Sequence, residues 1–473
     1  MRLSRAGQRF AGAGKAELPM IEMSDRSTTS RTTVGVGRRF TLGLSVEHFD
    51  FRVDLHRFIE TLSEQVDVVV FTDRPFAHPV KGLKELRLYR WPRNLVAAIV
   101  TRFFLVFRRL PKSRNNFFIT EMFGLAQLPP ARQKRGLFYL RLRRLLPWGV
   151  SVDTVLPWLG GGDATSLEGV DAFLHITRIG SLPFLRRALT SGKPNAAYIY
   201  SWDHPCKHTT IPRGGMRAYF TWNRGLSEDL ADLQGVEPRL IREVGATQLA
   251  PLKQYLETPA ARQRLVPGDY VYYGCGTGTP DLVRQEVAVI LQLAVALREV
   301  APQTVLLVRP YPNLLDWSCY DALRRESNVR FDWFRQEGQG RELSAAQVFE
   351  KYNKVEHARA FVHLGTTLGW EACYFDRPVL FLAMDDFRAG SPGAGFDLRH
   401  FIHQYHNDRY MILNRFPNVV RRAEDLPATL RDALNQPAGF LAYNRAVADA
   451  TPLRSLSDIA AGILKELVPT PAT

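Results

Sequence analysis

The chain is poor in cysteine and has no long apolar run. Its 473 residues include four cysteines, which lie far apart and form no C-x-x-C pair. This spacing argues against a disulfide framework and a structural zinc site, and it favours a reducing cytoplasm. No apolar run approaches the roughly twenty residues that a membrane-spanning helix needs, and charged residues stand where a signal peptide would be apolar. We therefore expect a chain that neither spans a membrane nor is exported by that route.

Acidic residues are scarce in one stretch of the chain. Between residues 91 and 150 a single acid, Glu121, accompanies twelve bases, so this stretch carries +11 of the net charge of +15. The bases alternate with apolar and aromatic residues, as in NLVAAIVTRFFLVFRRL and RGLFYLRLRRLLPW. That pattern is typical of helices lying in the surface of an anionic bilayer. Two amphipathic helices packed on the domain core, with a solvated basic face, are the other interpretation. No recognised nucleic-acid motif accompanies the charge, so we do not predict nucleic acid as a partner.

The length and the order of apolar runs predict two α/β domains. The runs at 40–45, 66–73, 304–308 and 360–364 are apolar on successive residues, which is typical of strands buried on both faces of a parallel sheet. The expected fold class is α/β, with two doubly wound, Rossmann-like domains facing each other across a cleft. The predicted units are a flexible basic leader (1–38), a first domain (39–246) with a basic insertion (91–150), a polar connector (247–268), a second domain (269–450), and a C-terminal amphipathic helix and tail (451–473).

The most informative segment is AFVHLGTTLGWEACYFDRPVLFLA at residues 360–383. It predicts a strand, a loop at Gly365, Thr366 and Thr367, a helix containing Glu371, and a second strand. Ligands of parallel α/β sheets bind beyond the carboxyl ends of the strands, so this loop is a candidate phosphate site at a helix N-terminus. The alternative is that one threonine merely caps the helix. Glu371 lies one helical turn beyond Thr367, from where its carboxylate could accept hydrogen bonds from ribose hydroxyls.

Two further loops of the second half follow predicted strands and should converge on the same edge of the sheet. One is GCGTGT at 274–279, whose glycines allow close backbone approach to a pyrophosphate. The other is RPYP at 309–312, where a guanidinium suited to bidentate phosphate contacts stands at a strand end, with a surface ion pair as the alternative. The candidate ligand-binding residues are Gly276, Thr277, Gly278, Arg309, Tyr311, Gly365, Thr366, Thr367 and Glu371.

These segments resemble a known family. GTTLGWEACYFDRPVLFL is similar to the donor motif of GT-B glycosyltransferases, and the order of 309–312 before 365–367 resembles bacterial capsule and cell-surface polysaccharide transferases. Among those are Kdo transferases, sialyltransferases and glycerophosphotransferases. They have His-Pro where this chain has Tyr311-Pro312. This departure argues against the CMP- or CDP-linked donor that those families use. Residues 219–248 resemble the inter-domain junction of such proteins.

The resemblance implies an inverting, metal-independent glycosyltransferase that uses a nucleotide-sugar as co-substrate, binds no cofactor tightly, and acts on a glycan or lipid-linked acceptor. Such an enzyme needs a base from the first half to deprotonate the acceptor hydroxyl. The candidates are Glu47, His48 and Asp50 after the first strand, and Asp203 and His204 after a later one. A capping role is the alternative for each carboxylate.

The implied location is the cytoplasm, at the inner face of the cytoplasmic membrane. Residues 91–150 would bind the anionic lipid surface. Two rival functions share the fold: a non-hydrolysing sugar-nucleotide epimerase, and a non-catalytic relative that binds glycan or lipid. No metal site is predicted, because His400, His403 and His406 recur every three residues and would drift around a helix axis.

Overall fold

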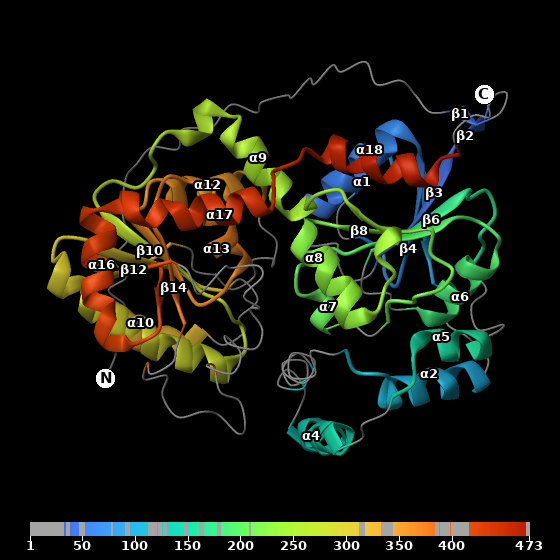
Figure 1. The fold of residues 1–473 in the computed structure, drawn as a ribbon, viewed down its shortest axis with the longest axis horizontal. Helices are drawn as coiled ribbons and strands as arrows, with labels where there is room; N and C mark the ends of the chain where they lie inside the picture. Colours follow the sequence, from blue (N-terminus) through green and yellow to red (C-terminus); the bar gives the residue numbers. More distant parts are fainter. Residues whose placement is uncertain are drawn as a thin grey trace, which may run out of the picture.

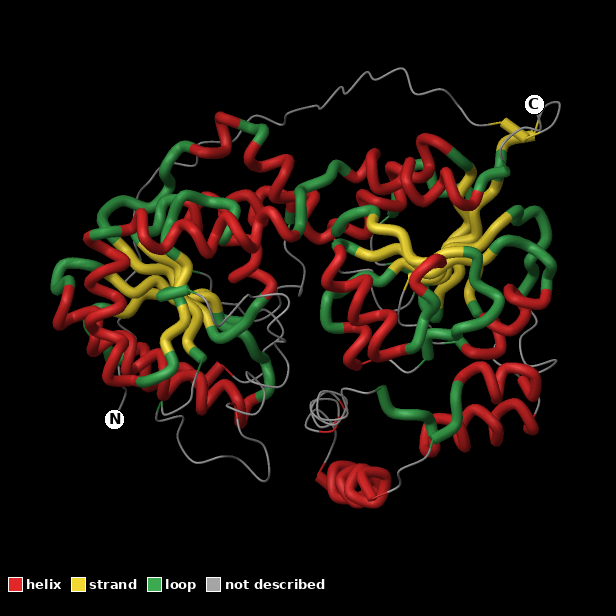
Figure 2. Tube along the Cα trace, in the orientation of Figure 1, coloured by secondary structure: helices red, strands yellow, loops and turns green. Residues whose placement is uncertain are grey.

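The structure is a computed structural model. It describes residues 33–34, 38–46, 53–76, 79–89, 95–111, 121, 125, 130–145, 149–159, 165–176, 181–207, 210–311, 317–332, 344–383, 387, 398 and 416–469. Two parallel sheets lie side by side, each with helices on both faces (Figures 1 and 2). The fold class predicted from the sequence, α/β with two doubly wound, Rossmann-like domains, is confirmed.

The first sheet has the order β5-β4-β3-β6-β7-β8-β9, and all its neighbouring strands are parallel. The predicted strands at 40–45 and 66–73 form β3 and β4, whose residues are almost all buried. The strands are β3 (Thr41–Ser45), β4 (Asp67–Thr72), β5 (Glu85–Leu88), β6 (Ala172–Ile176), β7 (Asn195–Tyr198), β8 (Ala218–Thr221) and β9 (Ile241–Glu243). A separate two-stranded ladder joins β1 (Thr33–Val34) to β2 (Arg38–Arg39).

Most helices around the first sheet connect successive strands, and two more come from the basic insertion. They are α1 (Val53–Gln65), α2 (Leu95–Phe107), α4 (Pro130–Leu145), α5 (Val152–Val155), η1 (Leu156–Leu159), α6 (Leu182–Thr190), α7 (His204–Lys207), α8 (Arg224–Asp229), the π-helix η2 (Leu230–Gln234) and η3 (Pro238–Leu240). The insertion helices α2 and α4 are in contact with each other and lie on one side of this domain (Figure 1).

The second sheet is also parallel throughout, in the order β12-β11-β10-β13-β14-β15. Its strands are β10 (Tyr270–Gly274), β11 (Val305–Arg309), β12 (Val329–Phe331), β13 (Ala360–His363), β14 (Val379–Leu382) and β15 (Val419–Val420). The helices of this half are η4 (Thr247–Leu249), α9 (Ala250–Leu256), η5 (Pro259–Arg262), α10 (Pro280–Val300), η6 (Trp317–Tyr320), α11 (Asp321–Arg324), α12 (Ala345–Glu356), α13 (Thr367–Ala372), η7 (Ala423–Asp425), α16 (Leu426–Asn435), η8 (Pro437–Phe440) and α17 (Leu441–Ala450).

The end of the described chain crosses back to the first domain. Helix α17 packs on the second domain, whereas α18 (Leu456–Leu467) lies against α1 of the first (Figure 1). The Arg242 Nε donates to Glu466 Oε1 over 3.0 Å and so ties α18 to β9. The indole rings of Trp222 and Trp370, one from each half, meet edge to face with centroids 6.4 Å apart. The buried tryptophan pair therefore joins the two domains, and the return of α18 to the first domain links them through the chain.

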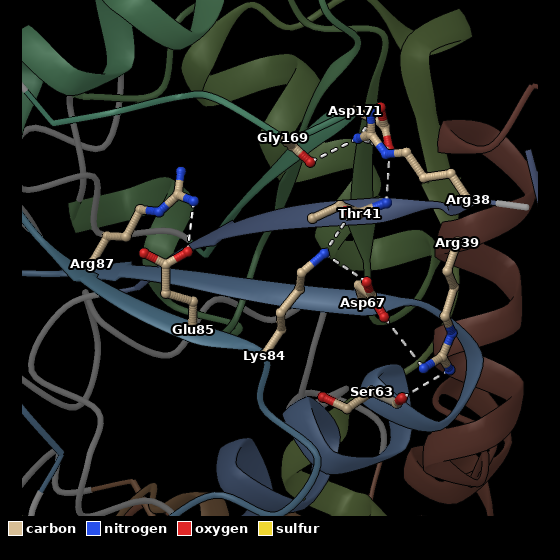
Figure 3. Close-up of polar contacts among 10 residues, drawn as sticks. All are labelled: Arg38, Arg39, Thr41, Ser63, Asp67, Lys84, Glu85, Arg87, Gly169 and Asp171. Carbon is tan, nitrogen blue, oxygen red and sulfur yellow. Dashed lines mark hydrogen bonds and ion pairs between the residues drawn. The ribbon is translucent and has the colours of Figure 1, made fainter.

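A polar network holds the amino-terminal edge of the first sheet together (Figure 3). The Arg38 guanidinium lies 3.0 Å from Asp171 Oδ1, and the Thr41 N–H donates to Asp171 Oδ2 over 2.8 Å. Nearby, Lys84 Nζ donates to Asp67 Oδ2 over 2.7 Å. The Asp171 contacts tie β3 to the start of β6, and the Lys84 contact ties the start of β5 to β4. Ligands of open parallel α/β sheets bind beyond the opposite, carboxyl ends of the strands.

Candidate functional site

The centre of the second sheet is a topological switch point. Strand β10 leads outward to β11 and β12 on one side, whereas β13 leads to β14 and β15 on the other. The loops that follow these two neighbouring strands, residues 275–279 and 364–366, therefore flank the position where open parallel sheets bind their ligands. Both loops belong to the segments that the sequence singles out as donor-binding.

The first of these loops approaches the second closely at Gly276. A Cβ placed on Gly276 would stand 3.8 Å from the Gly365 carbonyl oxygen and 3.8 Å from Glu286 Oε1. Thr277 is buried, and its Oγ1 accepts the Thr279 N–H over 3.3 Å, which shapes the turn into α10. Gly276 and Gly278 remain partly exposed. The predicted residues Gly276, Thr277 and Gly278 thus lie in the loop that follows β10 at the switch point.

Glu286, which was not predicted from the sequence, holds this loop through hydrogen bonds. Its Oε1 accepts the Gly276 N–H over 2.9 Å and the Tyr273 hydroxyl over 3.0 Å. Burial disfavours the charged carboxylate and raises the pKa of Glu286 to about 7, although the hydrogen bonds from Gly276 and Tyr273 act in the opposite direction. Its signal in the sequence is an acid within the apolar run of α10.

The second loop is held by His363, which also was not singled out. His363 is fully buried at the end of β13, and its Nδ1 accepts the N–H groups of Gly365 (2.9 Å) and Thr366 (3.4 Å). Gly365 has φ +111°, a left-handed conformation that favours glycine. A Cβ on Gly369 would overlap the His363 ring, so α13 can cross the imidazole only with glycine there.

Thr366 caps α13, as the alternative interpretation of the sequence has it. Its Oγ1 accepts the Leu368 N–H over 3.3 Å. Thr367 has a different partner, because its Oγ1 accepts the indole Nε1–H of Trp202 from the first domain over 3.4 Å. Trp202 follows β7 and Thr367 follows β13, so the carboxyl edges of the two sheets meet here. Phosphate binding by either threonine stays a prediction.

Arg309 lies in a buried ionic network at the end of β11. Its guanidinium pairs with Asp332, which also accepts the Tyr272 hydroxyl (2.5 Å) and pairs with Lys354 Nζ (2.5 Å). Burial alone would raise the pKa of the Asp332 carboxyl, but the Arg309 and Lys354 charges outweigh it and lower the pKa. The sequence left a surface ion pair as the alternative; the structure contains an ion pair, but a buried one, and the phosphate contact of Arg309 stays a prediction. Tyr311 is partly buried against the core.

Glu371 lies buried between α13 and α12. Its Oε2 pairs with Lys351 Nζ at 2.7 Å, and its Oε1 accepts the Tyr352 hydroxyl over 3.1 Å. Both carboxylate oxygens therefore have partners on α12 in this structure. A ribose contact would add to these interactions or replace one of them, and it stays a prediction.

Of the candidate bases, Asp203 and His204 lie in the described part of the chain, beyond the carboxyl end of a strand of the first sheet. Strand β3 and its neighbour β6 form the switch point of that sheet, and β3 ends at Ser45. Glu47, His48 and Asp50 follow β3 immediately and lie outside the described residues. Asp203 and His204 follow β7 and are buried. From its position in the sequence, the set after β3 is expected beside the switch point. The structure places Asp203 and His204 after β7, which is the strand next to β6.

Asp203 is paired rather than poised to accept a proton. Its Oδ1 accepts the Ser201 hydroxyl over 2.7 Å, and its Oδ2 pairs with Lys207. Burial would raise the pKa of the Asp203 carboxyl, but the Lys207 and His204 charges and the two hydrogen bonds hold it well below its usual range. A carboxylate with so low a pKa is a weak general base. In the described part of the chain, no three His, Cys, Asp or Glu side chains are grouped to hold a metal ion.

Comparisons with known proteins give similarities of fold only. No family model matches the chain, and no curated protein matches it in sequence. Among solved structures it is similar to a UDP-GlcNAc 2-epimerase of Methanocaldococcus jannaschii in complex with UDP-GlcNAc and UDP (10% identity, 90% of this chain and 98% of that chain covered, TM-score 0.48). It is also similar to the calicheamicin glycosyltransferase CalG4 (13%, 91% and 100%, TM-score 0.42) and to the wall teichoic acid polymerase TagF (10%, 90% and 88%, TM-score 0.45). Similarity at this level assigns neither a reaction nor a substrate.

Proposed function

We propose that this protein is a glycosyltransferase that moves a sugar from a nucleotide-activated donor to a growing surface polysaccharide or a lipid-linked glycan. The observation that supports the proposal best is the meeting of two glycine-containing loops at the switch point of the second sheet, with the first domain in contact beside them. A donor held at that position would present its sugar toward the other domain. A two-substrate transfer needs such a junction, because donor and acceptor must meet.

The donor pyrophosphate would lie against the loop at 275–279, where glycine leaves room for close backbone approach. The position of Gly276 supports this, since a Cβ added there would stand 3.8 Å from the Gly365 carbonyl oxygen and would narrow the space between the loops. Glu286 makes the loop acidic only when it is ionised, and its raised pKa favours the neutral form below about pH 7. A neutral Glu286 would remove one repulsive charge from beneath a phosphate.

The acceptor hydroxyl would lose its proton to a group of the first domain. The pairing of Asp203 with Lys207 disfavours that carboxylate as the base. The proposed bases are accordingly His204, which follows Asp203 directly, and the set Glu47, His48 and Asp50 at the end of β3. We propose an inverting reaction without a metal ion, at the inner face of the cytoplasmic membrane.

A thermal-shift screen with UDP, GDP, CMP, CDP and their sugar conjugates tests the donor site. A ligand that binds only the folded protein raises Tm. At a concentration a hundredfold above Kd it increases the free energy of unfolding by about 2.7 kcal/mol. Gly276→Ala is the sharpest variant, because its methyl would make only ordinary contacts in the folded protein and yet stand between the loops. We expect the nucleotide affinity to fall roughly tenfold or more, which corresponds to about 1.4 kcal/mol.

The matched control is Gly439→Ala in the same domain, where an added Cβ meets nothing within 4 Å. It should keep both the fold and the nucleotide shift. Glu371→Ala is a poorer probe, since it would leave Lys351 without its buried carboxylate partner. Once a donor is identified, nucleotide release that depends on a glycan acceptor supports transfer. Interconversion of the sugar without an acceptor would indicate an epimerase instead, and the absence of any nucleotide shift would refute both.

A further inference from the structure

Exposed apolar side chains gather on the insertion rather than spreading over the surface. Among the described residues, fourteen large apolar side chains are exposed, and eleven of them lie between residues 95 and 158. Those eleven are Leu95, Val96, Ile99, Phe103, Leu105, Val106, Phe138, Tyr139, Leu142, Leu145 and Trp158. Single exposed apolar residues are ordinary on a soluble protein, but such a cluster marks a site that binds another protein or a membrane.

Helix α2 is apolar on two opposite faces. Ala97 and Phe104, seven residues apart, are completely buried where the helix packs on the domain. On the other side Leu95, Ile99 and Phe103 recur every fourth residue and are 73%, 57% and 48% exposed. Packing on the domain accounts for the first face only. A helix with a second apolar face needs a second apolar environment.

Helix α4 has the arrangement of an interfacial helix. Phe138, Leu142 and Leu145 stand at i, i+4 and i+7 and are 64%, 46% and 77% exposed. The exposed bases Lys134 and Arg141 border this stripe at helical spacing. Neither α2 nor α4 contains an acidic residue. An apolar stripe bordered by bases alone matches the headgroups and acyl chains of an anionic bilayer.

The two helices and Trp158 lie on neighbouring elements. Helix α2 is in contact with α4, α5 and η1, and these helices lie together beside the first domain (Figures 1 and 2). Trp158 on η1 is 69% exposed. Tryptophan favours the membrane–water interface, where its ring has an apolar and a polar environment. None of the helices in the described part of the chain is long and apolar enough to cross a membrane.

We propose that this insertion surface, made of the outer faces of α2 and α4 with Trp158, binds the headgroup layer of an anionic lipid bilayer. The apolar side chains enter the boundary between headgroups and acyl chains, and Arg102, Lys134 and Arg141 bind lipid phosphates. Lipid suits this surface better than a second copy of the chain, because a second copy would bring the same bases face to face without compensating acids. The inference is independent of the reaction catalysed.

Flotation of the full-length protein with vesicles tests the proposal. Binding to phosphatidylcholine vesicles that contain phosphatidylglycerol is expected, with much weaker binding to phosphatidylcholine alone and a decrease at high salt. Replacing Lys134 and Arg141 by Gln should lower the partition coefficient about fivefold for each base. Replacing Ile99 and Phe103 by Ser should lower it by roughly tenfold for each side chain.

The matched controls carry the same substitutions elsewhere. Leu265→Ser and Val295→Ser remove side chains that are each 55% exposed, and Arg284→Gln removes an exposed base of α10. These variants should bind vesicles as the wild type does. Quenching by brominated lipid should reach Trp158, and the difference between the wild type and Trp158→Phe isolates its contribution.

The replaced side chains are exposed, so Tm should stay within a few degrees of the wild type in each variant. Three results would overturn the proposal: no binding of the wild type to anionic vesicles, equal loss in the control variants, or no quenching of Trp158. A change of oligomeric state in the Ile99 and Phe103 variants without loss of vesicle binding would assign the surface to a second copy instead. No nucleotide or acceptor enters these assays, so they remain decisive if the proposed transfer fails.

Discussion

The buried carboxyl of Glu286 predicts a distinctive pH dependence of stability. Burial raises its pKa from an ordinary 4.5 to about 7. Between these two pH values the folded protein holds a proton that the unfolded chain has released. The folded state binds more protons there, so the free energy of unfolding falls as the pH rises through this window. At about 1.4 kcal/mol per pKa unit, the loss amounts to roughly 3 kcal/mol and is complete above about pH 8.

Glu286→Gln isolates this effect. The amide oxygen can still accept from the Gly276 N–H and the Tyr273 hydroxyl, but the side chain no longer ionises. We expect the wild type to lose about 3 kcal/mol relative to the variant between pH 4.5 and 8. Urea unfolding at a series of pH values measures this difference, because other titrating groups are present in both proteins and cancel. An identical pH dependence in the two proteins would refute the reasoning.

Three further predictions concern buried groups. Gly369→Ala should destabilise the protein by about 1–3 kcal/mol, because the new methyl would overlap the imidazole beneath it, whereas the control Gly439→Ala should melt like the wild type. Asp332→Asn should cost roughly 3–5 kcal/mol in urea unfolding, since it removes the carboxylate charge beside the buried Arg309 and leaves Lys354 with Glu350 alone, and the exposed Asp281→Asn should cost far less. Burial lowers the pKa of His175 to about 4, so the unfolded chain binds a proton between pH 6.5 and 4 that the folded protein does not. Stability should therefore fall by about 3 kcal/mol on acidification through this range, and a His175→Gln variant that kept the same fall would contradict the assignment.

Much of the fold was predictable because its signals are local. The runs at 40–45, 66–73 and 304–308 are apolar on successive residues and end at turn residues, and they form β3, β4 and β11. Strand β5 was not predicted, since its sequence ELRL is short, charged and only partly buried. A strand of this kind is formed by pairing with its neighbour rather than by its own pattern.

The candidate site was predictable in outline for the same reason. A glycine-rich turn after a buried strand can be recognised in the sequence, and parallel pairing brings such turns to one edge. The loops at 275–279 and 364–366 do adjoin in the structure. Glu286 and His363, which hold these loops by accepting their N–H groups, were not predicted from the sequence. Each lies among apolar neighbours, where a polar residue gives no indication of which loop it will contact.

The sequence by itself determined the local patterns: which segments are buried strands, which segments are helical, and where the bases concentrate. Only the tertiary structure decided the partners. It pairs Arg309 with Asp332, encloses Glu371 between Lys351 and Tyr352, and returns α18 to pack on α1. These contacts join residues far apart in the chain, and their free energy depends on how the whole core packs, whereas a strand or helix pattern depends on neighbours a few residues away.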